Sequence, residues 1–235
     1  MKKKIKNKRL LFLFSFFVCS IVNSQEIKIL KDSILINSDY FMIEEFKITS
    51  INENINNKIY KIVQSTYDIF EKPFFSNPEN RLKVKKDTIN NRIKTNRLLE
   101  SITGFEHYEI YYDKNKILNF SIKLQSYGSP WESNKYYTFD LNKGSKIGSD
   151  FFINQQKLLK ICQMKFKNEN KNLIFKLEDL NNYKILMTNN QNISGLDFSL
   201  FDYKNHRNSG YEEFIVHFDW KEIKNYVSKI YLKRL

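Results

Sequence analysis

The chain has 235 residues, of which 41% are apolar and 15% aromatic, so one domain of this length can bury a core of its own. Its net charge is +13, but the first 24 residues carry six of the positive charges and no negative one. The +7 that remains on residues 25–235 is ordinary solubility charge, or gives a mild attraction to anionic walls and lipids, and it does not indicate nucleic-acid binding.

Residues 1–24 have the layout of a secretory signal peptide. A basic head, Lys2–Arg9, precedes an apolar stretch, Leu10–Val22, and Ser24 supplies the small residue expected at a cleavage position. Because the apolar stretch is shorter than the roughly 20 residues that cross a bilayer, we expect cleavage and no transmembrane segment afterwards. The mature protein, residues 25–235, is therefore expected to be exported, either to the periplasm or as a secreted protein.

Three β-rich runs follow the leader and open an N-terminal strand–helix subdomain, which we assign to residues 25–104. The runs cover residues 26–30, 33–37 and 39–48, and the sequence at 31–32 suits a turn between the first two. We therefore expect three short strands before the first helix.

The apolar period then changes to three and four residues, which predicts a helix between Ile51 and Phe70. Ser50 and Glu53 have the spacing of a capping box at its start, and Pro73 ends it. This helix is expected to pack one apolar face against the strands.

The stretch 74–104 is the least regular part of the sequence. Pro78 can open a helix, and the apolar positions after it are loosely helical. The stretch is also basic, through Lys83, Lys85, Lys86, Arg92, Lys94 and Arg97. The favoured interpretation is a solvated helix or a loop insertion, and a face that binds a polyanion is the alternative.

The clearest strand pattern lies in the middle of the chain. Apolar residues alternate with polar ones between Leu118 and Gln125, which is typical of an antiparallel strand with one buried face. The residues expected on the polar face are Asn119, Ser121, Lys123 and Gln125. The runs 108–112 and 137–141 alternate in the same way, so three strands are expected here.

The C-terminal part is predicted to add further helices and strands. These are a helix over 158–166, a short helix over 173–180, strands over 195–203 and 211–218 with a polar loop at 204–210, and a final helix that Asp219 and Glu222 cap. Cys162 lies on an apolar helix face, where we expect a small buried hydrophobe rather than a nucleophile. It is the single cysteine after the leader, which excludes an intramolecular disulfide.

The order of these elements fits the α+β class, with amphipathic helices packed against an antiparallel sheet. No linker or repeat divides residues 25–235, so we expect a single domain. Within it, residues 105–235 form the second part, after the strand–helix subdomain.

Several of these patterns resemble a known family. The segments that carry the resemblance are 108–112, 115–122, 137–144, 150–152, 195–198 and 213–224. They are similar to the domain of unknown function in the extracellular C-terminal region of the anti-sigma factor RsiV, which also accompanies PdaC-type peptidoglycan deacetylases. Residues 39–72 are similar to the segment that commonly precedes that domain, and together the resemblance covers most of residues 25–235.

The resemblance implies an exported, accessory α+β binding module without catalytic residues of its own. In RsiV this region senses lysozyme by binding it. The present chain departs from the family at Tyr127–Glu132, where a Gly-Gly-x-His-type loop would usually follow the second central strand. If that loop contributes to the choice of partner, lysozyme binding does not follow from the resemblance.

The residues that could carry catalysis are sparse. His107, His206 and His217 lack the close spacing of a zinc site, and we expect no metal or other cofactor. Ser209, His206 and Asp202 could be written as a hydrolase triad, but the Gly-x-Ser-x-Gly elbow is missing. Adjacent glutamates at 44–45 and 212–213 would point to opposite faces of a strand, unlike a glycosidase pair.

The best binding candidate is the predicted loop 127–136. It carries Tyr127, Trp131 and Tyr136, and aromatic residues in a proline-rigidified loop can recognise partners or stack on sugars. The alternative is that Trp131 folds back over the sheet edge. A second predicted loop, with His206 and Arg207, could line the same end of the sheet.

The sequence therefore predicts a non-catalytic binding or sensing module of the cell envelope or the medium. Its partner would be an envelope protein or a peptidoglycan-like glycan, and not a nucleic acid. The alternative is a hydrolase that acts on cell-wall material through carboxylates that the sequence does not identify.

Overall fold

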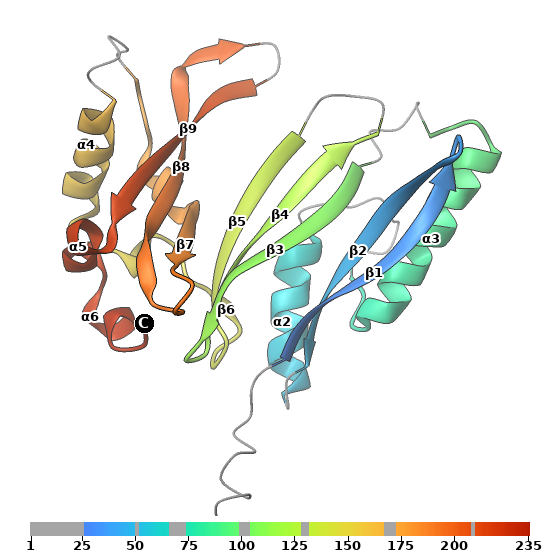
Figure 1. Ribbon diagram of the computed structural model, residues 1–235, viewed down its shortest axis with the longest axis horizontal. Coiled ribbons are helices and arrows are strands. Elements are labelled where there is room, and N and C mark those ends of the chain that lie inside the picture. The colour runs from blue at the N-terminus through green and yellow to red at the C-terminus, as the bar shows by residue number, and fades with distance from the viewer. Residues whose placement is uncertain are drawn as a thin grey trace, which may run out of the picture.

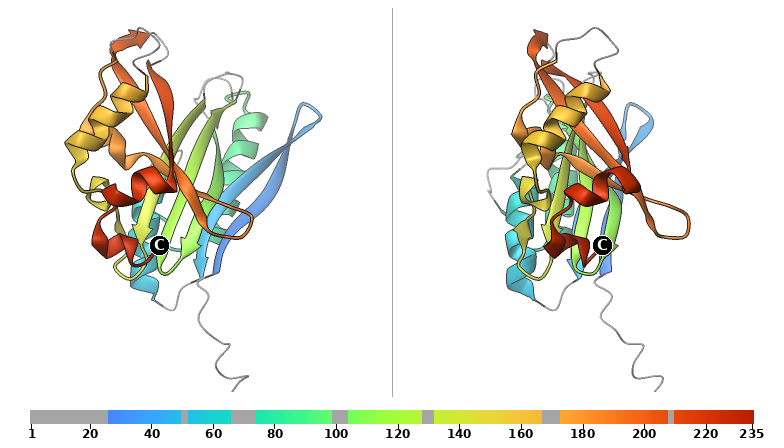
Figure 2. Two further views of the ribbon diagram at one scale, coloured as in Figure 1. Left: turned by 60° about the vertical axis from the view of Figure 1, so that its left-hand side comes forward. Right: turned by 90° about the vertical axis from the view of Figure 1, so that its left-hand side faces the viewer.

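The computed structural model describes residues 26–49, 52–65, 74–98, 104–127, 132–166, 173–207 and 210–235. These residues form helices and antiparallel sheets, which confirms the predicted α+β class. The strands make three sheets rather than the one that was predicted. The central sheet lies between the C-terminal sheet on one side and the β1–β2 hairpin with α2 on the other (Figures 1 and 2).

The first sheet is a hairpin of β1 (Glu26–Ile36) and β2 (Asp39–Thr49). Its turn consists of Asn37 and Ser38, which both have positive φ values of 49° and 75°. The turn predicted at 31–32 is therefore wrong. Lys31 instead pairs with Glu44 across the strands, and β1 continues without a break to the turn.

Two helices follow, α2 (Glu53–Gln64) and α3 (Pro78–Lys94). The N-cap of α2 is Asn52, whose side chain accepts the amide of Ile55, so the capping box predicted from Ser50 is wrong. The predicted extension to Phe70 and the stop at Pro73 lie outside the described residues. Helix α3 starts at Pro78, as predicted, and covers the hairpin (Figure 1).

The central sheet has the order β3-β4-β5-β6, with bounds Gly104–Lys114, Ile117–Ser126, Glu132–Asp140 and Ser145–Lys146. The apolar face of β4 packs against α2 and β2 through Phe120, which stacks on Phe46. The opposite face is covered as well, because Asn119 is 0% and Ser121 3% exposed. The sequence predicted that the polar face of β4 is exposed to solvent. In the structure, part of this face is buried inside the protein.

The C-terminal region contains η1 (Ser149–Phe151), α4 (Gln155–Lys165), η3 (Leu177–Asn181), β7 (Tyr183–Met187), β8 (Ile193–Arg207) and β9 (Gly210–Asp219). Helix α4 confirms the predicted helix and buries Cys162 against the third sheet. Strand β7 was not predicted, and the helix predicted at 173–180 is only the short η3. Strands β8 and β9 extend well into the polar loop predicted at 204–210.

The chain ends in three short pieces: α5 (Trp220–Ile223), η4 (Lys224–Tyr226) and α6 (Lys229–Leu232). The capping box of Asp219 and Glu222 is present, as predicted. The prediction of a single final helix is wrong, because Val227 is extended and forms a β-bridge with Phe152. In the described part of the chain, no helix has the length and apolar character needed to cross a membrane.

Candidate functional site

The residues of the predicted binding loop do not form one cluster. Tyr127 packs against Phe41 and Phe105, with ring centroids 5.6 and 6.4 Å away. Tyr136 belongs to β5 rather than to a loop, and it stacks on Tyr111 at 6.3 Å. Trp131 lies outside the described residues, so its predicted role stays a prediction.

The second predicted loop is largely strand. His206 and Arg207 form the end of β8, and their side chains lie outside the described part of the structure. Strand pairing places Arg207 opposite Gly210 and His206 opposite Tyr211. Their predicted role in binding therefore stays a prediction too.

Two rows of polar side chains face each other where the central and C-terminal sheets meet. The first row crosses the central sheet, where Ser121 pairs with Glu109 on one side and Tyr136 on the other. The second row crosses the C-terminal sheet, where Asp197 pairs with Lys184 and with His217. We call these rows, together with Tyr111, Ser199 and Glu213, the inter-sheet face.

The rows are joined by Lys184 of β7. Its Nζ atom lies 3.8 Å from Oε1 of Glu109 and 4.2 Å from the centre of the Tyr111 ring. The Tyr111 hydroxyl donates to Glu109 Oε2 at 2.9 Å and contacts Ser121 Oγ at 2.7 Å. A phenol ring and a carboxylate of one sheet thus hold an ammonium group of the other.

The carboxylates of the C-terminal sheet bond to polar neighbours within that sheet. Asp197 Oδ1 lies 2.8 Å from Nδ1 of His217, and Ser199 donates its hydroxyl hydrogen to Glu213. Burial, and then the charges of Glu213, Asp197 and Glu109, raise the pKa of Tyr136 to about 12. The hydrogen bond to Asp197 raises the pKa of His217. The face therefore presents neutral phenol groups next to carboxylate side chains.

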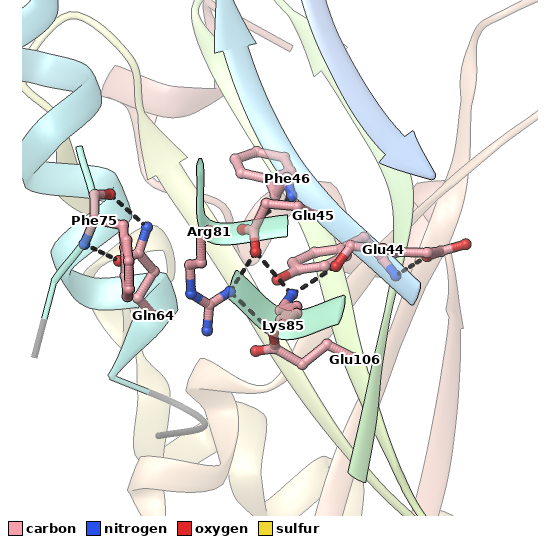
Figure 3. A network of polar contacts seen from close by, with 9 residues as sticks. Glu44, Glu45, Phe46, Gln64, Phe75, Arg81, Lys85 and Glu106 are labelled. Atoms are coloured by element: carbon pink, nitrogen blue, oxygen red, sulfur yellow. Dashed lines mark hydrogen bonds and ion pairs between the residues drawn. The ribbon is translucent and has the colours of Figure 1, made fainter. Parts of the chain in front are cut away.

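A second polar cluster is buried between α3, β2 and β3 (Figure 3). Arg81 Nη1 lies 2.5 Å from Glu45 Oε2 and 3.0 Å from Glu106 Oε2. Lys85 Nζ contacts the same two oxygens at 2.7 and 2.6 Å. These four side chains are between 0 and 5% exposed and carry two charges of each sign. We call them the buried ion cluster.

The buried ion cluster lies beside the seam between β2 and β3, which belong to different sheets. Side chains satisfy the backbone groups that a strand ladder would otherwise use. Glu44 accepts the Tyr108 amide at 3.0 Å, and Lys85 donates to the Glu44 carbonyl at 2.5 Å. The hydroxyl of Tyr60 accepts the Ile48 amide at 2.7 Å. The cluster therefore joins the hairpin and α3 to the central sheet, which is a structural role.

Acid is expected to weaken this seam over a defined pH range. Burial raises the pKa of Glu44, but His107, the Tyr108 amide and Lys31 lower it by more, so it lies at about 2 instead of 4.5. Because the folded pKa is the lower one, ionised Glu44 stabilises the fold above pH 4.5. This contribution, on the order of 3 kcal/mol, should disappear as the pH falls from 4.5 to about 2.

Urea unfolding from pH 7 to pH 2 measures this effect when the protein is compared with Glu44→Gln, which does not titrate. The difference in unfolding free energy between the two should shrink below pH 4.5. A difference that stays constant down to pH 2 would contradict the assignment.

Two of the side chains weighed for catalysis, Cys162 and Asp202, have structural roles. Cys162 is fully buried, which confirms its prediction as a buried hydrophobe, and burial raises the pKa of its thiol to about 12. Asp202 is buried and accepts the amides of Ile174 and Lys204 at 3.2 and 3.0 Å. Ser209 lies outside the described residues. Within the described ranges, no three His, Cys, Asp or Glu side chains are grouped to hold a metal ion.

No protein-family model matches the sequence, and no curated protein matches it. The resemblance to the RsiV-type domain therefore depends on the segments quoted from the sequence, and it stays a prediction.

Proposed function

We propose that this protein is an exported binding module of the cell envelope or the medium, which acts without a catalytic centre of its own. Its ligand is an envelope protein or a peptidoglycan-like glycan. The leader pattern of residues 1–24 supports export. The resemblance to an accessory domain of envelope proteins supports a binding role.

The inter-sheet face is the observation that carries the proposal. Tyr111 and Tyr136 are half-buried and held by a rigid sheet, so little side-chain freedom is lost when a ligand packs on them. Carboxylates and hydroxyls from three other strands, β4, β8 and β9, belong to the same face and can bond to a polar ligand. Half-buried tyrosines with polar neighbours are frequent anchors in protein and sugar recognition.

Substitution of Tyr136 by alanine is expected to weaken ligand capture roughly tenfold or more, which is the loss of a binding hot spot. Binding is measured by co-sedimentation with insoluble peptidoglycan and by pull-down from envelope extract, both with the purified protein. Tyr40→Ala is the matched control, because Tyr40 is a 77% exposed tyrosine of β2 outside the inter-sheet face.

Thermal unfolding of both variants checks that they fold. If the protein binds neither peptidoglycan nor envelope material, or if both variants bind equally well, the inter-sheet face is not the binding site. Digestion of peptidoglycan that Asp197→Asn abolishes would instead favour a hydrolase, since Asp197 would then act as its acid or base.

A further inference from the structure

We infer that the inter-sheet face binds a primary ammonium or guanidinium group, presented by a lysine or arginine side chain of a protein partner. This inference rests on the proposed binding function and gives its ligand a chemical class.

The first argument is that the face already holds one ammonium group of the chain itself. Lys184 comes from β7 and reaches across to the central sheet, where Tyr111 lies under its Nζ atom at 4.2 Å and Glu109 at 3.8 Å. The lysine side chain is 31% exposed, so the ring and the carboxylate hold its ammonium group close to water. An aromatic face and a carboxylate are the combination that stabilises a partly hydrated cation.

The second argument is that the same combination occurs again next to it. The Tyr136 ring stacks on the Tyr111 ring at 6.3 Å. On the facing sheet, Asp197 pairs in register with Lys184, and Glu213 bonds to Ser199, two residues further along β8, so both carboxylates lie next to the Lys184 position. Their charges contribute to the raised pKa of Tyr136. Among the described side chains, neither carboxylate forms an ion pair with a lysine or arginine; their partners are His217 and Ser199. Tyr136 with Asp197 and Glu213 therefore repeats the combination of ring and carboxylate without a described lysine between them.

The third argument is charge complementarity. Glu109, Asp197, Glu213 and Asp219 lie on or beside the face and outnumber Lys184, whereas residues 25–235 carry a net charge of +7. The rest of the molecule thus repels a basic partner and this face attracts it, which directs the encounter. Asp197 is already bonded to His217 at 2.8 Å, so Glu213 is expected to supply the larger part of the affinity.

The test uses three probes with the purified protein: a fluorescein-labelled octapeptide that alternates lysine and serine, the same peptide with acetylated lysines, and a chitin oligosaccharide. Fluorescence anisotropy should show binding of the first peptide alone, with an affinity that falls as salt is added. Glu213→Gln should weaken this binding roughly tenfold. Glu178→Gln is the control, because Glu178 is an exposed carboxylate of η3 that pairs with Lys176, and it should change nothing.

Equal binding of the acetylated peptide, or an unchanged affinity of Glu213→Gln, would overturn the inference. Binding of the oligosaccharide alone would overturn it in favour of a glycan and leave the proposed function intact. Capture of envelope material through Tyr136 without peptide binding would likewise overturn the inference alone. Failure of every probe, together with failure of envelope capture, would overturn both.

Discussion

Arg81→Met is expected to lower the free energy of unfolding by about 3–5 kcal/mol, which is the usual loss when one partner of a buried ion pair is removed. The guanidinium group is 1% exposed and contacts both Glu45 and Glu106. Without it, Lys85 alone must compensate two buried carboxylates. Denaturation in urea, followed by circular dichroism, measures the change.

Lys47→Met is the matched control, because it removes a cation from an ion pair at the surface. Lys47 and its partner Glu79 have side chains that are 32% and 49% exposed, so the expected loss is below about 1 kcal/mol. Adding Glu106→Leu to Arg81→Met should restore part of the stability, since the double variant again has equal numbers of buried charges. A loss for Arg81→Met no larger than that of the control would show that the buried ion cluster is not a major source of stability.

Local patterns predicted the elements whose signals lie within a few residues. Pro78 does open a helix, Asp219 and Glu222 do form a capping box, and the alternation from Leu118 to Gln125 does form a strand. These signals depend on backbone bonds and side-chain periods that are fixed inside one element. These predictions therefore do not depend on contacts between distant parts of the chain.

The buried ion cluster could not be predicted in the same way, because its members come from three separate segments. Helix α3 has few apolar residues and was interpreted as solvated. Arg81, Lys85 and Ile89 nevertheless recur at intervals of four residues and share one buried face. That spacing was a signal in the sequence, but its meaning depends on Glu45 and Glu106, which meet the helix only in the folded chain.

The surroundings of the candidate site could not be predicted from local sequence patterns either. Tyr136 was predicted to belong to a binding loop, because Gly128 and Pro130 precede it. Strand β5 starts at Glu132, and alternation along it turns Tyr136 toward the C-terminal sheet. The facing row on β7–β9 could not be inferred, since the number of sheets and their contact are tertiary properties.

Asn119→Ala is the second substitution with a large expected effect, because this side chain joins two sheets. Asn119 Nδ2 donates to the Tyr183 carbonyl at 3.0 Å, and its Oδ1 accepts the Ile185 amide at 2.8 Å. The carboxamide thereby takes the place of a backbone peptide group beside β7, an edge strand of its sheet. Alanine leaves the Tyr183 carbonyl and the Ile185 amide without this partner, which should lower the free energy of unfolding by about 2–5 kcal/mol.

Amide hydrogen exchange distinguishes this cause from a general loss of packing. The Ile185 amide should exchange much faster in Asn119→Ala, and equilibrium unfolding in urea should show the lower stability. Asn134→Ala is the control, because Asn134 is an exposed asparagine of the same sheet, and it should leave both measurements unchanged. Normal protection of Ile185 in Asn119→Ala would mean that the two sheets associate through apolar contacts alone. In that case the hydrogen bonds from Asn119 of β4 to the edge strand β7 would not be needed to hold the two sheets together. Other contacts would then determine the geometry of the inter-sheet face.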